Sequence, residues 1–189
     1  MNNHIQVVNF SLKIAKTPIL KDINIIIPDK QLTVLIGPSG CGKTSFLKSL
    51  NRLMDLEERA EYSGKIMIDD ENLLEITTDL PRIRKKMGLL LQKPYPLPMN
   101  IFENVAFGPR LNKKNKKELK QIVEFYLKEV SLWEEVKDKL YGSATELSVG
   151  QQQRLCLARC LAAEPEIILC DEPTSALDPF LQKKLKRNL

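Results

Sequence analysis

The alternation of apolar and polar positions along the chain predicts an α/β fold. Short apolar or alternating runs, typical of strands, lie at residues 5–10, 23–27, 32–36, 65–68, 87–91 and 167–170. Helical spacing of apolar residues predicts helices at residues 43–53, 80–84, 116–136 and 151–163. Because strands alternate with helices, we expect a mostly parallel core sheet with an antiparallel β part at its N-terminal end. Residues 93–160 read as an inserted helical subdomain, and residues 1–92 and 161–189 as the core around it.

Composition narrows the class of protein only in part. A chain of 189 residues is predicted to form a single domain, and its net charge of +5 suits a nucleotide, a membrane surface or a nucleic acid equally well. No apolar run reaches the roughly 18 residues of a membrane span. Four cysteines without C-x-x-C spacing and a single histidine argue against a zinc site and for a reducing, cytoplasmic compartment.

Residues 37–44, Gly-Pro-Ser-Gly-Cys-Gly-Lys-Thr, match the phosphate-binding loop G-x-x-x-x-G-K-[ST] between a strand pattern and a helix pattern. Glycines let backbone amides approach phosphate oxygens, and the helix start favours negative charge. Lys43 is expected to reach the β- and γ-phosphates, and the Thr44 hydroxyl to bind Mg²⁺. The predicted nucleotide contacts here are Gly37, Pro38, Ser39, Gly40, Cys41, Gly42, Lys43, Thr44 and Ser45.

The apolar run 167–170 leads directly into Asp171 and Glu172, as a Walker B strand does. Two carboxylates are needed there for two tasks. Asp171 is expected to hold Mg²⁺ through water opposite Thr44, and Glu172 to orient and polarise the attacking water.

Three further motifs carry a family resemblance. Residues 147–151, Leu-Ser-Val-Gly-Gln, resemble the signature motif L-S-G-G-Q of the ATP-binding-cassette (ABC) ATPases, and residues 175–178 resemble their D-loop. Gln92 ends a predicted strand where the family has its Q-loop glutamine. The chain, from residue 5 to about 179, is therefore identified as a member of this P-loop NTPase family. Residues 51–56, 92–108, 132–137 and 151–156 are similar to the phosphate-importer ATPase subfamily.

The resemblance implies an ATP-hydrolysing importer subunit, with ATP and Mg²⁺ bound between two cassettes of a homodimer. Lys43, Gln92 and Glu172 would be catalytic, and Thr44, Gln92 and Asp171 would bind the metal. Ser148, Gly150 and Gln151 of one subunit would meet the γ-phosphate held by the other. Residues 94–104 would receive a short helix of a transmembrane permease. The resemblance also implies a cytoplasmic protein, peripheral on the inner face of the membrane, with no nucleic-acid partner.

Three departures from the family pattern bear on these expectations. Ile14 stands where the family usually has an aromatic residue stacked on adenine, so ATP binding is expected to be weaker unless Phe10 substitutes. Val149 replaces the first glycine of the signature, and a β-branched residue avoids positive φ. The chain also stops eleven residues after Asp178, before the strand that carries the switch histidine. We interpret it as a cassette without its C-terminal part, whose interior strands lack a partner.

Two other readings of function stay open. A degenerate cassette would bind nucleotide or a partner without turnover. A soluble ABC ATPase of DNA repair or translation would normally carry a coiled-coil insertion or tandem cassettes, which this chain lacks. Within transport, an importer ATPase for polar amino acids is the second choice of cargo, after phosphate.

Overall fold

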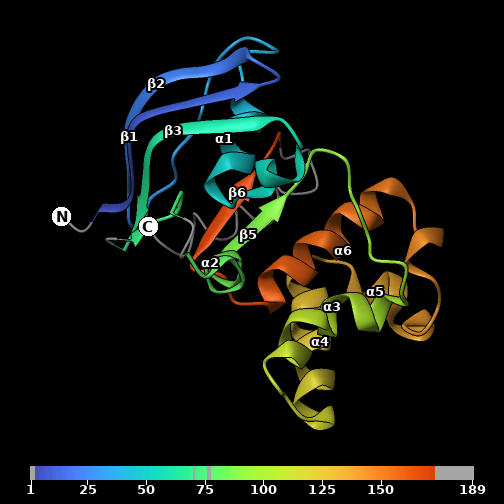
Figure 1. Cartoon of the computed structure of the whole chain (residues 1–189). Coiled ribbons are helices and arrows are strands. Elements are labelled where there is room, and N and C mark those ends of the chain that lie inside the picture. The colour runs from blue at the N-terminus through green and yellow to red at the C-terminus, as the bar shows by residue number, and fades with distance from the viewer. Residues whose placement is uncertain (1–2, 70, 76–77, 173–189) are drawn as a thin grey trace. The chain divides into compact units, whose positions relative to one another are not determined.

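The computed structural model describes residues 3–69, 71–75 and 78–172. The predicted D-loop at residues 175–178 and the basic tail lie outside the described residues. The chain divides between Arg84 and Lys85 into two compact units, each of which is described by itself (Figure 1). The division into a core at residues 1–92 and 161–189 and a helical subdomain at 93–160 stays a prediction.

The first unit contains a four-stranded antiparallel sheet in the order β2-β1-β3-β4. Its strands are β1 (Asn3–Ile14), β2 (Thr17–Pro28), β3 (Ala60–Ile68) and the short β4 (Glu71–Asn72). The sequence predicted shorter first strands because the tight turn between β1 and β2 has no glycine. Ala15 and Lys16 make that turn with φ values of 48° and 70°, the left-handed conformation of a two-residue hairpin.

A small aromatic core joins this sheet to helix α1 (Lys43–Leu50). Phe10 of β1 has no exposed surface, and its ring centroid lies 6.5 Å from that of Phe46 on α1. On its other side Phe10 stacks on Tyr62 of β3 at 6.2 Å. The 3₁₀ helix η1 (Leu53–Leu56) follows α1. The helix predicted at residues 43–53 therefore ends earlier than expected.

The strand predicted at residues 32–36 does not form. These residues lie in neither sheet, and Leu32, Val34 and Ile36 are 65%, 68% and 94% exposed. A strand forms only where a neighbouring strand accepts and donates its backbone hydrogen bonds. The four strands of the first unit pair among themselves, so the alternating pattern at 32–36 has no partner there.

In the second unit, two parallel strands form a small sheet. Strand β5 (Met87–Leu90) pairs with β6 (Ile167–Cys170) in a register that runs from Met87 opposite Ile167 to Leu90 opposite Cys170. Helix α2 (Leu80–Lys86) leads directly into β5. Among the described residues, the parallel part of the fold therefore has two strands, fewer than the mostly parallel core sheet expected.

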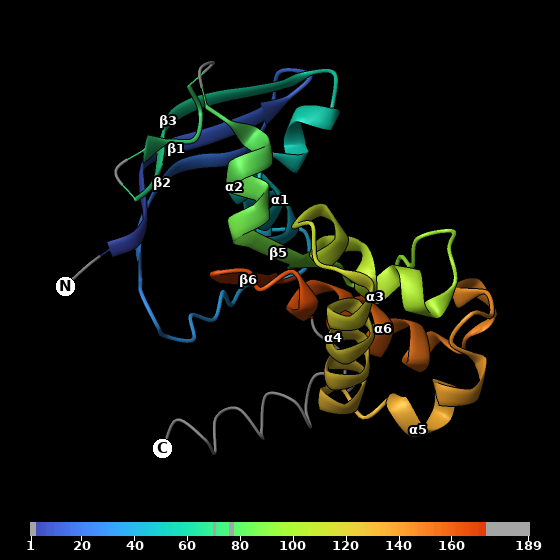
Figure 2. The same cartoon turned by 90° about the horizontal axis from the view of Figure 1, so that it is seen from below.

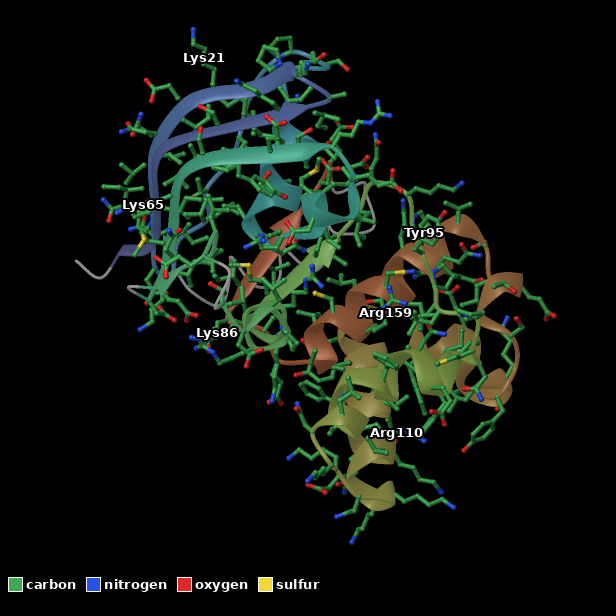
Figure 3. All side chains as sticks on the ribbon, viewed as in Figure 1. Lys21, Lys65, Lys86, Tyr95, Arg110 and Arg159 are labelled. Atoms are coloured by element: carbon green, nitrogen blue, oxygen red, sulfur yellow. The ribbon has the colours of Figure 1, made fainter. Side chains whose placement is uncertain are left out.

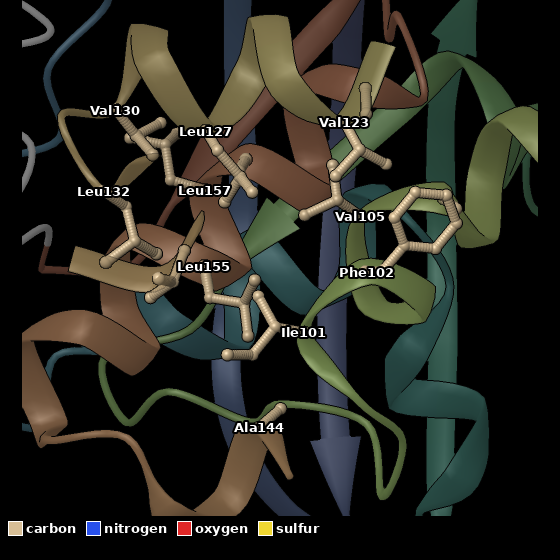
Figure 4. Close-up of a cluster of buried hydrophobic side chains, with 14 of the residues drawn as sticks. Ile101, Phe102, Val105, Val123, Leu127, Val130, Leu132, Ala144, Leu155 and Leu157 are labelled. Carbon is tan, nitrogen blue, oxygen red and sulfur yellow. The ribbon is translucent and has the colours of Figure 1, made fainter. Parts of the chain in front are cut away.

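Helices make up most of the second unit. They are α3 (Ile101–Leu111), α4 (Lys116–Glu129), α5 (Trp133–Val136) and α6 (Val149–Ala162), with the 3₁₀ helices η2 (Lys137–Lys139) and η3 (Ala144–Glu146). Helices α3, α4 and α6 pack on one another (Figure 2). A buried apolar cluster that includes Ile101, Val105, Val123, Leu127 and Leu155 fills the space between them (Figure 4).

The helix predicted at residues 116–136 is broken in two. Ser131 adopts φ 54°, its amide donates to Lys128 O (3.0 Å), and the Leu132 amide donates to Leu127 O (2.9 Å). These two bonds form a Schellman motif, and the buried side chains of Leu127 and Leu132 give it the usual hydrophobic contact. Glycine is the usual residue at this left-handed position. A serine there gives no sequence signal for the break.

Among the described residues, no helix is both long and apolar enough to span a membrane.

Candidate nucleotide-binding site

The phosphate-binding loop of the first unit has the backbone conformation that its glycines predict. Gly40 and Gly42 have φ values of 79° and 98°, which other residues rarely adopt. Gly42 is also the N-cap of α1, and a Cβ there would lie 2.7 Å from Leu20 Cδ2. At Gly42 the glycine is therefore required by the turn into α1 itself.

Lys43 is held over this loop by the loop's own backbone. Its Nζ donates to the carbonyl oxygens of Gly37 and Pro38, both at 2.9 Å, and lies 3.9 Å from the exposed Cys41 thiol. Because the ammonium group already lies at the loop, its positive charge is placed where a phosphate would be recognised.

At the position predicted to face adenine, Phe10 does not substitute for the missing aromatic residue. Ile14 is half-buried at the end of β1, opposite Thr17 of β2 and Ala60 of β3. Phe10 is fully buried, with its ring next to those of Phe46 and Tyr62, and offers no face to a base. Any contact of Ile14 with adenine is therefore aliphatic.

The second unit brings Gln92, Asp171 and Glu172 together at the ends of its two parallel strands. The Asp171 amide donates to Leu90 O (2.9 Å), which extends the β5–β6 pairing by one residue, and the Asp171 side chain is buried. Gln92 Nε2 donates to Glu172 Oε2 at 2.5 Å. Parallel strands end at the same edge of a sheet, so residues 80 positions apart in sequence meet there.

These three side chains line a hollow in the second unit. Its wall is completed by the end of β5, by the residues that follow it and by residues of α6, namely Leu89, Leu90, Leu91, Lys93, Pro94, Tyr95, Gln153, Cys156, Leu157 and Arg159. Carboxylates at a concave site beside an amide and basic side chains suit a metal-bound phosphate. Burial raises the pKa of the Cys156 thiol, which is therefore protonated at neutral pH.

The predicted signature residues form the first turn of α6. Ser148 is the N-cap, its Oγ accepts the Gln151 amide (3.3 Å), and Gln151 Oε1 accepts the Ser148 amide (3.0 Å), which makes a capping box. Val149 is helical and 65% exposed, so its β-branched side chain is not forced into positive φ. The replacement of glycine by Val149 therefore causes no backbone strain at this position. The surroundings of Gly150 are open.

The predicted site residues fall in different units. Lys43, Thr44 and Ile14 belong to the first, and Gln92, Asp171, Glu172, Ser148, Gly150 and Gln151 belong to the second. Within the second unit, Gln92 and Glu172 are in direct contact. Convergence of Lys43 and Thr44 with Asp171 and Glu172 stays a prediction.

Sequence reasoning missed two polar clusters that hold the second unit together. In the first, Arg159 of α6 donates to Tyr95 O (2.9 Å) and to Asn104 Oδ1 of α3 (3.1 Å), and the side chains of Arg159 and Tyr95 are labelled in Figure 3. In the second, Glu135 binds Gln151 and Arg154. These residues resemble solvated helix positions in sequence, and no motif marks them.

The comparisons with known proteins agree with these motifs. The family model described as "ABC transporter" matches residues 20–175. The chain belongs to the ABC transporter family, as its sequence predicted. It is 50% identical over 168 residues to the phosphate import ATP-binding protein PstB 3 of Streptococcus pneumoniae serotype 4, covering 88% of this chain and 67% of that protein. PstB 1 of Bacillus licheniformis is also 50% identical over 168 residues, which are 88% of this chain and 65% of that protein. The chain thus spans about two thirds of the length of these curated relatives.

Solved structures share the fold. CbiO1 from Clostridium perfringens, described as part of the ABC transporter complex cbiONQ, aligns with a TM-score of 0.75 at 24% identity, over 99% of this chain and 72% of that one. A structure titled as the ATP binding subunit of an ABC transporter aligns with a TM-score of 0.78 at 21% identity, over 97% and 72%. The cassette fold predicted from the sequence is confirmed.

Proposed function

We propose that this chain is the ATP-binding and ATP-hydrolysing subunit of an importer for inorganic phosphate. The observation that carries the proposal is the 50% identity, over 88% of the chain, to proteins named for phosphate import and ATP binding. Lys43, Thr44, Gln92, Asp171 and Glu172, which have the chemistry for ATP hydrolysis, support the proposal. Nothing in the site chemistry selects phosphate as cargo, because an ATPase subunit does not contact the transported ion.

The residues present fit a magnesium-bound nucleotide. The loop glycines have no Cβ that would keep a phosphate away from the backbone amides. Lys43 would supply a positive charge for the β- and γ-phosphates. Thr44 and Asp171 offer the oxygen ligands that Mg²⁺ prefers, and Gln92 adds an amide oxygen. The metal, when bound, would offset negative charge on the phosphates.

Glu172 is the proposed base that orients the attacking water. Its carboxylate is exposed and held by Gln92 at 2.5 Å, which fixes its direction while leaving the second oxygen for a water molecule. Gln92 thereby links the carboxylate to the segment that follows β5. We propose that this segment, residues 94–104, receives a helix of a transmembrane permease.

Two copies of the chain are proposed to enclose two nucleotides. The exposed first turn of α6, with Ser148, Val149 and Gly150, would meet the γ-phosphate bound to the other copy. ATP would then hold the pair closed and hydrolysis would release it, a shift between two global states. The protein would lie on the cytoplasmic side of the membrane, bound to its permease.

The test is ATP binding and turnover by the purified chain with Mg²⁺. We expect phosphate release by the wild type, loss of release with retained binding in Glu172→Gln, and loss of binding in Lys43→Ala. Absence of ATP affinity in the wild type would refute the proposal. The cargo needs a separate test, in which the chain restores phosphate uptake to cells that lack their own importer ATPase.

A cassette that binds nucleotide without turnover is the second candidate. Ile14, which offers no aromatic face, and Val149, which places a branched side chain on the exposed first turn of α6, favour it. Tight binding of ATP with no phosphate release by the wild-type chain would select this function.

A further inference from the structure

The side chain of Gln151 is fixed at both ends. Its amide oxygen accepts the Ser148 backbone N–H at 3.0 Å, and its amide nitrogen donates to Glu135 Oε2 at 2.8 Å. Only this orientation is chemically possible, because a backbone N–H can only donate and a carboxylate can only accept. The Gln151 amide is therefore turned toward its own unit and is committed to two internal contacts.

Glu135, on the short helix α5, is the centre of this arrangement. Its second oxygen, Oε1, lies 2.8 Å from a guanidinium nitrogen of Arg154, one turn along α6. Arg154 in turn donates to Ser131 O at 3.0 Å, in the turn that separates α4 from α5. The hydrogen bond from Gln151, together with the Arg154 charge, holds the pKa of the Glu135 carboxyl below its usual value, so the group is ionised at neutral pH.

The two oxygens of Glu135 therefore hold two successive turns of α6 at once. The first turn carries the residues proposed to contact the γ-phosphate across the dimer. An α-helix leaves its first amides without intrahelical acceptors, and the capping box satisfies those of Ser148 and Gln151 here. The remaining donors of this turn lie at the exposed residues Val149 and Gly150.

We infer that Glu135 is a positioning residue, which holds Gln151 in the capping box and so fixes the exposed turn at residues 148–150. The inference rests on the proposed function only for its catalytic consequence. It also revises the expected role of Gln151, whose side chain serves as an internal support of the turn and not as a ligand of nucleotide.

The variant Glu135→Gln tests this with almost no change in shape. In Glu135 the two contacts use different oxygens, Oε2 for Gln151 and Oε1 for Arg154. A carboxamide of the same shape replaces one of these oxygens by an NH₂ donor, and because the charged guanidinium of Arg154 is the stronger donor, we expect the remaining oxygen to face Arg154 and the contact with Gln151 to be lost. Glu134→Gln is the matched control, because Glu134 is the adjacent residue and carries the same charge. Its ion pair is with the exposed Lys137, at 2.5 Å between Oε2 and Nζ, and not with α6. Both variants lose one negative charge from α5.

The primary measurement is hydrogen–deuterium exchange of the free protein, which needs neither nucleotide nor turnover. For Glu135→Gln we expect exchange at the amides of Ser148 and Gln151 to be about fivefold faster, the effect of a lost helix cap. Glu134→Gln should match the wild type. Equal exchange in the two variants would overturn the inference.

A charge swap provides the rescue. In Glu135→Gln/Gln151→Glu, the carboxylate at position 151 can accept both the Ser148 N–H and the carboxamide N–H of position 135, whose oxygen remains for Arg154. Gln151→Glu alone places two carboxylates face to face and should raise exchange. Recovery of wild-type protection in the double variant supports the inference, and additive loss of protection overturns it.

The catalytic consequence is read separately from phosphate release. If the proposed function holds, Glu135→Gln should lower kcat about tenfold, as expected of a misplaced contact group, with little change in the KM for ATP. Glu134→Gln should leave both unchanged. Wild-type protein without turnover would refute the proposed ATPase, while the exchange data would still decide the role of Glu135.

Discussion

Asn104 of α3 is a buried polar residue, and its side chain should contribute strongly to the stability of the second unit. Its side chain has no exposed surface. The amide oxygen accepts the Leu97 N–H (2.8 Å) and an Arg159 guanidinium N–H (3.1 Å). The amide nitrogen donates to the carbonyl oxygens of Leu97 (3.1 Å), Met99 (3.3 Å) and Asn100 (3.0 Å). One buried carboxamide thus folds residues 97–100 against α3.

The loss of unfolding free energy expected for Asn104→Ala can be estimated from these contacts. Two hydrogen bonds to Leu97 contribute about 1 kcal/mol each, and the bond from the charged Arg159 about 1.5 kcal/mol. Leu97 and Arg159 are half-buried, so water replaces part of what Asn104→Ala removes. We therefore expect the free energy of unfolding to fall by about 3 kcal/mol.

Urea unfolding followed by fluorescence measures this directly, because Trp133 is the only tryptophan of the chain and lies in the same unit. With a slope of about 2 kcal/mol per molar urea, the midpoint should fall by about 1.5 M. Asn112→Ala is the control, since Asn112 is an exposed residue at the end of the same helix and should change stability by less than about 0.5 kcal/mol. A loss below about 1 kcal/mol in Asn104→Ala would refute the reasoning.

Three further predictions concern other parts of the chain. Gly88→Ala should destabilise β5 by about 1–3 kcal/mol in urea unfolding, because the new Cβ would lie 2.2 Å from Cys160 Sγ, and Cys160→Ala should restore much of that loss. In a thiol-reagent titration, Cys41 should react first because it is exposed, while burial raises the pKa of Cys160 to about 12 and keeps it inert; equal rates would contradict this. Burial opposes ionisation of Asp55, but hydrogen bonds from Arg52 and Tyr62 outweigh it and lower the pKa of the carboxyl group below its ordinary value of 3.8. The ionised carboxylate should therefore stabilise the folded protein above about pH 4, and this contribution should disappear as the pH falls through the lowered pKa. Unfolding profiles of Asp55→Asn that match the wild type from pH 2 to 5 would exclude this contribution.

Local sequence predicted those parts of the site that depend on spacing along the chain. The glycine and lysine pattern at residues 37–44 specified the loop before α1, and the apolar run 167–170 placed Asp171 and Glu172 at the end of β6. Gln92 was placed at the end of β5 in the same way, and parallel pairing brought it to Glu172. Periodicity and motif therefore suffice where a residue's role follows from its own strand or turn.

The remaining features depend on partners that periodicity does not encode. Asn104 and Arg159 meet across 55 positions, and Glu135 meets Gln151 across 16, yet each reads in sequence as a polar position of a helix. Ser131 breaks a continuous helical pattern by a left-handed conformation that serine seldom adopts. Such contacts are decided by packing between elements and appear only in three dimensions.

Residues 32–36 have a sequence pattern typical of a strand but pair with no other strand in the part of the chain that the structure describes. Leu32, Val34 and Ile36 present apolar side chains to solvent beside a backbone that belongs to neither sheet of the described chain. An unpaired segment with a strand-like sequence is a site to which another strand can add. We therefore expect concentrated solutions of this chain to self-associate through residues 32–36, and Val34→Lys to reduce that association.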